Sequence, residues 1–109
     1  MIHIYIRNIA YTNIEKGIKK YELRLFRGIF KNIKIGDTIC LCNREMGMSF
    51  QRVVSNILKF TNFEQLLLKL DIKNCLVQYS NIEKGLEYMN TIYKPTLQKK
   101  HNCIAIAFN

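Results

Sequence analysis

The 109-residue sequence predicts an α+β fold, a small β-barrel of about five to six mostly antiparallel strands flanked by about two to four helices. Two observations support this fold class. Apolar residues alternate with other residues near both ends of the chain, which is the pattern of half-buried strands. Between these ends, two capping signals precede helically spaced apolar residues. A chain of this length buries one core, so residues 1–109 are expected to form a single domain.

The strand signals begin at the first residues. Isoleucine alternates with histidine, tyrosine and arginine over residues 2–7, and large side chains alternate with small ones over residues 103–108. The small face of the second segment could pack closely against another element. Gly36-Asp37 is a turn signal, and residues 43–48 read as a hairpin connection. We expect strands near residues 2–7, 20–25, 38–42, 50–60 and 103–108.

Helices are predicted where capping signals meet apolar runs. Residues 8–16 suit a short helix that ends at Gly17. The segments Thr61–Glu64 and Ser80–Glu83 each place a hydroxyl at the N-cap position and a glutamate three residues later. They predict helices near residues 62–70 and 81–93. The single proline, Pro95, ends the second of these or opens another turn.

The charge balance is strongly basic, with 17 Lys and Arg against 8 Asp and Glu and a formal net charge of +9. Such a field favours RNA, DNA, an anionic membrane surface or an acidic protein as partner, although it also serves solubility. Basic residues that could gather into a funnel for phosphates are Lys31, Lys34, Arg44, Arg52, Lys94, Lys99 and Lys100. Rings that could stack on bases, most of them expected in the core, are Tyr21, Phe26, Phe30, Tyr79 and Tyr93.

The four cysteines are expected to be reduced thiols in an intracellular, cytoplasmic protein, because no signal-peptide pattern precedes them. No apolar run approaches the length of a membrane span. Cys40 and Cys42 share one strand face, and His101 and Cys103 could complete a zinc quartet if the two strands were neighbours. The one-residue gap differs from the usual zinc spacing. We therefore predict no metal and no cofactor, and regard His3 as an ordinary strand residue.

The densest chemistry lies in residues 17–24, which have the spacing Gly-x-Lys-x-x-Glu-x-Arg. Glu22 and Arg24 are two apart and so share a strand face, whereas Lys19 joins them only if the corner after Gly17 twists. Arg24 could grip a phosphate, and Glu22 could accept hydrogen bonds from a base amino group. In an enzyme, Glu22 could act as general base while Lys19 stabilises negative charge. The alternative is a purely structural ion pair.

On this motif the chain resembles the ASCH domain family, a branch of the PUA-like barrels. Further similar segments are residues 35–37, Asn43-Arg44, residues 61–67 and residues 99–106, where the family usually has a glycine near Asn102. The resemblance thus covers nearly the whole chain. It implies a barrel flanked by helices, a cleft beside the motif, and RNA binding or a role in RNA metabolism.

Some bacterial relatives look like N4-acetylcytidine hydrolases that use a lysine, a threonine and a glutamate. Lys19 matches the lysine, but Glu22 stands where the threonine would be, and only Asp71 is acidic near the expected place of the glutamate. The first expectation is therefore a module that binds RNA or a modified nucleoside. The alternatives are a small hydrolase, acting on N4-acylcytidine or as a ribonuclease through Lys19 and Glu22, and a protein-interaction adaptor. Expected ligand-binding residues are Lys19, Glu22, Arg24, Arg44, Tyr93, Lys99 and Lys100.

Overall fold

The computed structural model describes residues 1–109 and contains five strands and a set of short helices. The strands are β1 (Ile2–Tyr5), β2 (Tyr21–Leu25), β3 (Thr38–Asn43), β4 (Met48–Phe60) and β5 (Cys103–Phe108). The helices are α1 (Asn8–Glu15), the 3-10 turn η1 (Gly28–Lys31), α2 (Phe63–Leu70), α3 (Ile72–Cys75), α4 (Ile82–Ile92) and α5 (Pro95–His101). No helix combines the length and the apolar character that crossing a bilayer would require.

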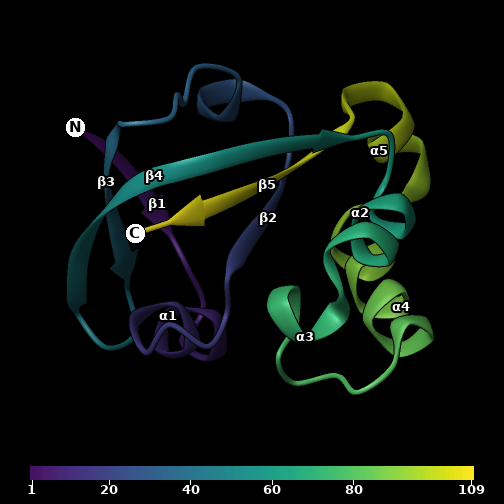
Figure 1. The fold of residues 1–109 in the computed structure, drawn as a ribbon, viewed down its shortest axis with the longest axis horizontal. Helices are drawn as coiled ribbons and strands as arrows, with labels where there is room; N and C mark the ends of the chain where they lie inside the picture. Colours follow the sequence, from purple (N-terminus) through teal and green to yellow (C-terminus); the bar gives the residue numbers. More distant parts are fainter.

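The five strands form one curled sheet, a half-barrel, in the order β1-β3-β4-β5-β2. All pairs are antiparallel except β1 with β3, which run parallel. The 13-residue β4 pairs with β3 through its first half and with β5 through its second half, and the register shifts between Val54 and Asn56. Figure 1 shows β4 spanning the molecule from the barrel to the helices. The α+β barrel class and the mostly antiparallel pairing are confirmed.

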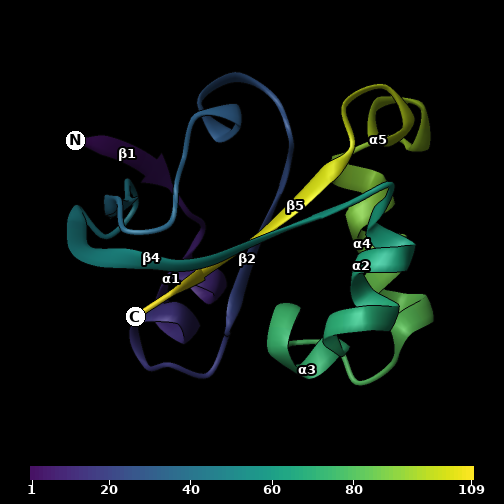
Figure 2. The same cartoon turned by 45° about the horizontal axis from the view of Figure 1, so that its top comes forward.

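The two faces of the sheet carry two separate cores. Inside the curl, Ile4, Leu41, Ile104 and Ile106 pack with Tyr11 of α1. On the outside, a second core forms under α2, α3 and α4, and Figures 1 and 2 show these helices gathered with α5 on one side of the sheet. Its members include Leu23, Leu25, Phe63, Leu66, Leu67, Cys75, Met89, Cys103 and Ala105. The alternation of large and small residues in β5 therefore serves both cores, as the sequence predicts.

The helix caps lie one residue later than the capping-box interpretation places them. Asn62, not Thr61, is the N-cap of α2, and its side-chain oxygen accepts a 2.8 Å hydrogen bond from the Gln65 backbone N–H. Asn81 caps α4 in the same way, instead of Ser80. Asparagine caps helices as well as serine and at least as well as threonine. The hydroxyl residue and the asparagine that follows it were therefore equally good N-cap candidates in the sequence.

Two short helices were not predicted. Pro95 occupies the first turn of α5, a place that suits proline because its missing N–H would have no intrahelical partner. The one-turn α3 is held close to α4 at Gly85, where an added Cβ atom would collide with the Ile72 side chain. This close approach helps to fix α3, whose last residue, Cys75, accepts a hydrogen bond from the lysine of the motif.

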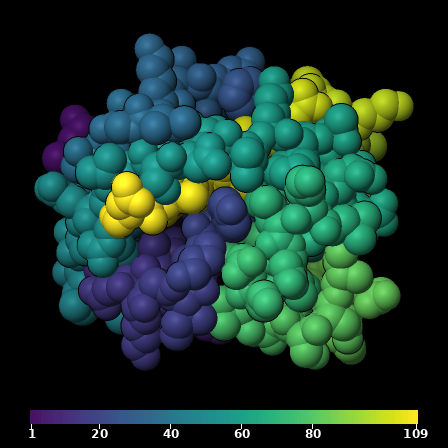
Figure 3. Space-filling model, in the orientation of Figure 1, coloured from purple at the N-terminus to yellow at the C-terminus, as the bar shows by residue number.

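The C-terminal residues lie at the surface between β4 and α1 (Figure 3).

Candidate functional site

A cavity of about 670 Å³ lies beside the motif, with walls from the end of β1, the start of α1, β2, the link after α3, and α4. Lys19, Glu22, Arg24 and Tyr93, all expected ligand-binding residues, line it. The structure therefore brings these four together. The other lining residues are Tyr5, Ile6, Arg7, Asn8, Ile9, Ala10, Asn13, Leu23, Glu45, Leu76, Val77, Gln78, Tyr88, Met89 and Ile92.

Arg24 and Glu22 share one face of β2, as their spacing predicts. Glu22 Oε2 accepts hydrogen bonds from Arg24 Nη2 at 2.8 Å and from Arg24 Nε at 3.1 Å. Arg24 Nη2 also donates to the backbone carbonyl of Tyr5 at 2.8 Å. Arg24 Nη1 has no hydrogen-bond partner in the protein and is not sealed from solvent, so it remains available to a ligand.

Lys19 reaches the same carboxylate from outside the strand. It precedes β2, in the link that follows Gly17, whose φ of +76° lies in the left-handed region that suits glycine. The Lys19 side chain is only 5% exposed, its Nζ donates to the Cys75 backbone carbonyl, and it lies 3.7 Å from Glu22 Oε1. The twist that the sequence required at this corner is therefore present. Each oxygen of Glu22 faces a different cation.

Burial governs the electrostatics of this group. Desolvation lowers the pKa of Lys19, and the Glu22 carboxylate offsets only part of that effect. Burial also acts to lower the pKa of Arg24, but the charge of Glu22 and its hydrogen bonds with Arg24 outweigh burial, so the pKa of Arg24 is raised. Burial raises the pKa of Tyr93, against the opposing charge of Arg24. The cavity lining contains three basic residues, Arg7, Lys19 and Arg24, against two acidic ones, Glu22 and Glu45, so its formal charge is positive by one.

The first turn of α1 adds hydrogen-bond donors to the cavity wall. Arg7 is the N-cap residue of α1 but provides no side-chain cap, and residues 7–10 line the cavity. The Asn8 side chain is engaged elsewhere, since it donates to Glu45 at 2.7 Å and accepts from Asn43 at 2.7 Å. Backbone N–H groups at a helix start that lack a cap favour anions. An anionic group could therefore be held between this turn and Arg24.

Arg44, Lys99 and Lys100 lie outside the cavity. The Arg44 guanidinium lies 4.0 Å above the ring of Tyr5, a lining residue, so Arg44 borders the cavity without entering it. Lys99 lines a second hollow of about 450 Å³ beside α2, and Lys100 lines neither. These two lysines therefore do not line the cavity with Lys19, and their expected part in binding RNA stays a prediction. They belong to α5, which packs beside α2 and α4 and away from α1 (Figure 1).

Several lining residues were missed by sequence reasoning. Of the five rings proposed for stacking, Tyr93 alone lines the cavity, while Tyr5 and Tyr88 line it and were not proposed. Asn8 carried a usable signal, because it stands where a strand passes directly into a helix. Tyr88 carried none, because its position depends on how α4 docks against the sheet.

The conditional zinc quartet does not form. Strand β4 lies between β3 and β5, and Cys103 is fully buried in the core under the helices. Cys103 is therefore separated from Cys40 and Cys42, and His101 lies beside it on α5.

Two solved structures share this fold. Hypothetical protein PH0355 is 28% identical in sequence, with a TM-score of 0.88 over 98% of this chain and 95% of that one. Protein PF0455 from Pyrococcus furiosus is 22% identical, with a TM-score of 0.78 over 99% of this chain and 94% of that one. No protein-family model matches the chain, and no curated protein does. The likeness therefore shows the fold over its whole length and assigns no ligand.

Proposed function

We propose that the protein is an RNA-binding module of the ASCH, PUA-like type that acts in RNA metabolism. One nucleotide of a single strand, or a modified nucleoside within it, occupies the cavity beside Lys19, Glu22 and Arg24. The observation that carries this proposal is the convergence of these three side chains and Tyr93 on one cavity. An ion-pair network with a purely structural role would not need such an opening.

The size and chemistry of the cavity support a nucleotide. A volume of about 670 Å³ falls within the range of about 300–1,000 Å³ that small-molecule sites occupy. Arg24 Nη1 and the start of α1 supply donors for a phosphate. Glu22 can accept a hydrogen bond from a base amino group, and Tyr93 offers a ring on which a base can stack.

The net charge supports a partner that is a chain rather than a free nucleoside. With a formal charge of +9, the molecule attracts a polyanion before any specific contact forms. Counterion release then makes the affinity fall as the salt concentration rises. This dependence separates RNA from an uncharged ligand.

The test compares two matched variants for binding to a fluorescently labelled single-stranded RNA over a series of salt concentrations. Arg24→Gln removes a charge inside the cavity, whereas Lys73→Gln removes one from a side chain that is 77% exposed and lies outside it. Arg24→Gln is expected to weaken binding about tenfold and to lower the salt slope by about 0.7. Lys73→Gln is expected to have a clearly smaller effect. Absence of binding at low salt, or equal losses in the two variants, would contradict the proposal.

A second candidate function is hydrolysis of a nucleobase amide such as that of N4-acylcytidine. It is favoured by one observation, the lowered pKa of Lys19 beside Glu22 in a cavity, because perturbed groups cluster at catalytic sites. Glu22 would remove a proton from water as the water oxygen attacks the acyl carbon. Lys19 would stabilise the oxyanion, and the C–N bond would break as Glu22 passes the proton it took from water to the leaving nitrogen, which releases the amine and a carboxylic acid.

Product formation from N4-acetylcytidine measures this activity directly. If the protein is such an enzyme, Lys19→Ala and Glu22→Gln each reduce turnover by about 100-fold or more. Equal turnover in the wild-type protein and both variants would exclude the two residues from the reaction. RNA binding without turnover would exclude the hydrolase and support only the binding function.

A further inference from the structure

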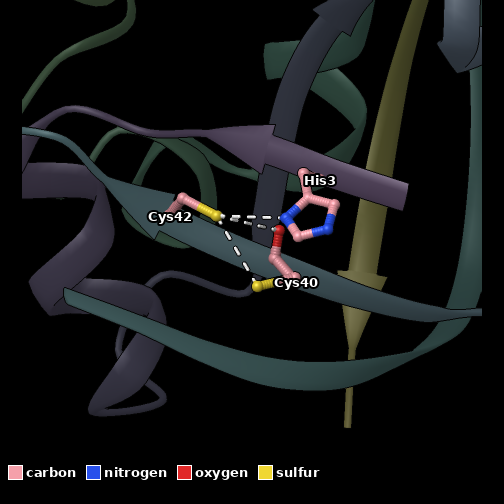
Figure 4. Close-up of side chains that lie close together, drawn as sticks. All are labelled: His3, Cys40 and Cys42. Atoms are coloured by element: carbon pink, nitrogen blue, oxygen red, sulfur yellow. Dashed lines mark hydrogen bonds between the residues drawn. The ribbon is translucent and has the colours of Figure 1, made fainter. Parts of the chain in front are cut away.

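A second cluster of reactive side chains lies on the opposite, outer face of the barrel. Parallel pairing of β1 with β3 sets His3 beside Cys40, and Cys42 follows two residues later on the same face. The Cys42 sulfur lies 3.6 Å from the Cys40 sulfur and 3.7 Å from His3 Nδ1. Figure 4 shows the imidazole and both thiols turned toward one another from the two strands.

These spacings match those of a tetrahedral metal centre. Zinc bonds of about 2.3 Å to sulfur and about 2.0–2.1 Å to nitrogen, at tetrahedral angles, separate two sulfurs by about 3.8 Å and a sulfur from a nitrogen by about 3.6 Å. The two measured contacts of Cys42 are within about 0.2 Å of these values. All three ligand atoms lie within 4.8 Å of one another. A modest rotation of the His3 or Cys40 side chain would therefore bring the remaining distance, between the His3 nitrogen and the Cys40 sulfur, to the value that a tetrahedral centre needs.

The backbone that carries the three residues is rigid. Ile39 and Leu41, which alternate with the cysteines along β3, are fully buried in the inner core. The ligands therefore sit on two paired strands and not on a loop. Access is open from one side, because His3 is exposed and Cys42 is half-buried.

We propose that His3, Cys40 and Cys42 bind a zinc ion. Two thiolates and an imidazole form a donor set that selects a borderline or soft cation over magnesium or calcium. Three protein ligands leave the fourth tetrahedral position open for water. The site is separate from the cavity beside Lys19, Glu22 and Arg24, because none of the three proposed ligands lines that cavity.

The experiment titrates the reduced, full-length protein with Zn²⁺ in competition with a chromophoric chelator. Co²⁺ provides a second readout, because thiolate ligation gives it an intense charge-transfer absorption that added Zn²⁺ abolishes. We expect one equivalent of each metal to bind per chain. His3→Gln, Cys40→Ser and Cys42→Ser should each weaken zinc binding by about 100-fold or more, since loss of even an outer partner costs about 10–100-fold.

Two variants serve as matched controls, His101→Gln for the other histidine and Cys75→Ala for a cysteine buried under the helices. Both should bind zinc as the wild-type protein does. Circular dichroism of each metal-free variant establishes that it is folded. Binding that is substoichiometric, that survives Cys42→Ser in a folded protein, or that is lost in Cys75→Ala would overturn the proposal and leave only weak thiol contacts at this face.

Discussion

The guanidinium of Arg24 on β2 and the backbone carbonyl of Tyr5 on β1 are joined by a 2.8 Å hydrogen bond. These two strands are the opposite edges of the curled sheet, so this bond links the edges of the half-barrel beside the cavity that both residues line. The same Nη2 atom contacts Glu22 at 2.8 Å. Arg24 therefore joins the two edges of the barrel and also lines the cavity.

Replacement of Arg24 by methionine should reveal the structural part of this role. Arg24→Met removes the link between the edges and leaves Glu22 with a single cation, so we expect the free energy of unfolding to fall by about 2–3 kcal/mol. Arg24→Lys should recover only part of this lost stability, because an ammonium cannot form the paired hydrogen bonds that a planar guanidinium makes. Urea unfolding measures both values. An Arg24→Met protein as stable as the wild type would show that the edges do not need this bond.

Lys19 should contribute more to binding than to stability. Its charge is buried, and desolvation lowers its pKa, so Lys19→Met removes a costly group while Glu22 keeps both bonds from Arg24. We expect the free energy of unfolding to stay within about 1 kcal/mol of the wild-type value or to rise. RNA affinity should fall, as titration of labelled RNA will measure. A loss of stability above about 3 kcal/mol with unchanged RNA binding would show that Lys19 stabilises the fold and does not bind the ligand.

The N-cap of α2 provides a test of the corrected helix start. Asn62→Ala should lower the free energy of unfolding by about 1 kcal/mol, because the Gln65 N–H loses its acceptor. Thr61→Ala is the matched control and should change stability by less than about 0.5 kcal/mol. Thermal or urea unfolding of the two variants gives the comparison. The reverse order of effects would restore the original capping-box assignment.

The buried thiol of Cys103 predicts a loss of stability at alkaline pH. Burial raises its pKa from 9.0 to about 12, so the folded state retains a proton that the unfolded state releases. The stabilisation is complete below pH 9.0 and is lost as the pH rises from there toward 12. Urea unfolding under reducing conditions should show this decline. Cys103→Ala, which costs about 1 kcal/mol at neutral pH, should decline less steeply. Parallel curves for the two proteins would exclude this thiol as the cause.

Much of the fold follows from local patterns, and what was missed depends on how distant elements pair. The alternation in β5 predicts both of its packing faces, and the spacing of Glu22 and Arg24 predicts their shared face. By contrast, the approach of His3 to Cys42 requires β1 to skip β2 and pair with β3 in parallel. No local signal in either strand encodes that choice.

The candidate site shows the same division. Lys19 and Glu22 have opposite parity in a continuous strand, and they meet because β2 begins only at Tyr21 and leaves Lys19 in the preceding link. The corner glycine allowed this geometry to be anticipated. The positions of Lys99 and Lys100 could not be derived, because they follow from α5, a helix whose first-turn Pro95 also reads as a turn.

Mapping of a bound nucleotide by NMR tests the central claim most directly. Cytidine monophosphate is added to the isotope-labelled protein, and the backbone amide shifts are followed residue by residue. We predict the largest changes at residues 7–10 and around Lys19, Arg24 and Tyr93, with small changes at Lys99 and Lys100. Shifts confined to α5, or no saturable change anywhere, would contradict the assignment of this cavity as the nucleotide site.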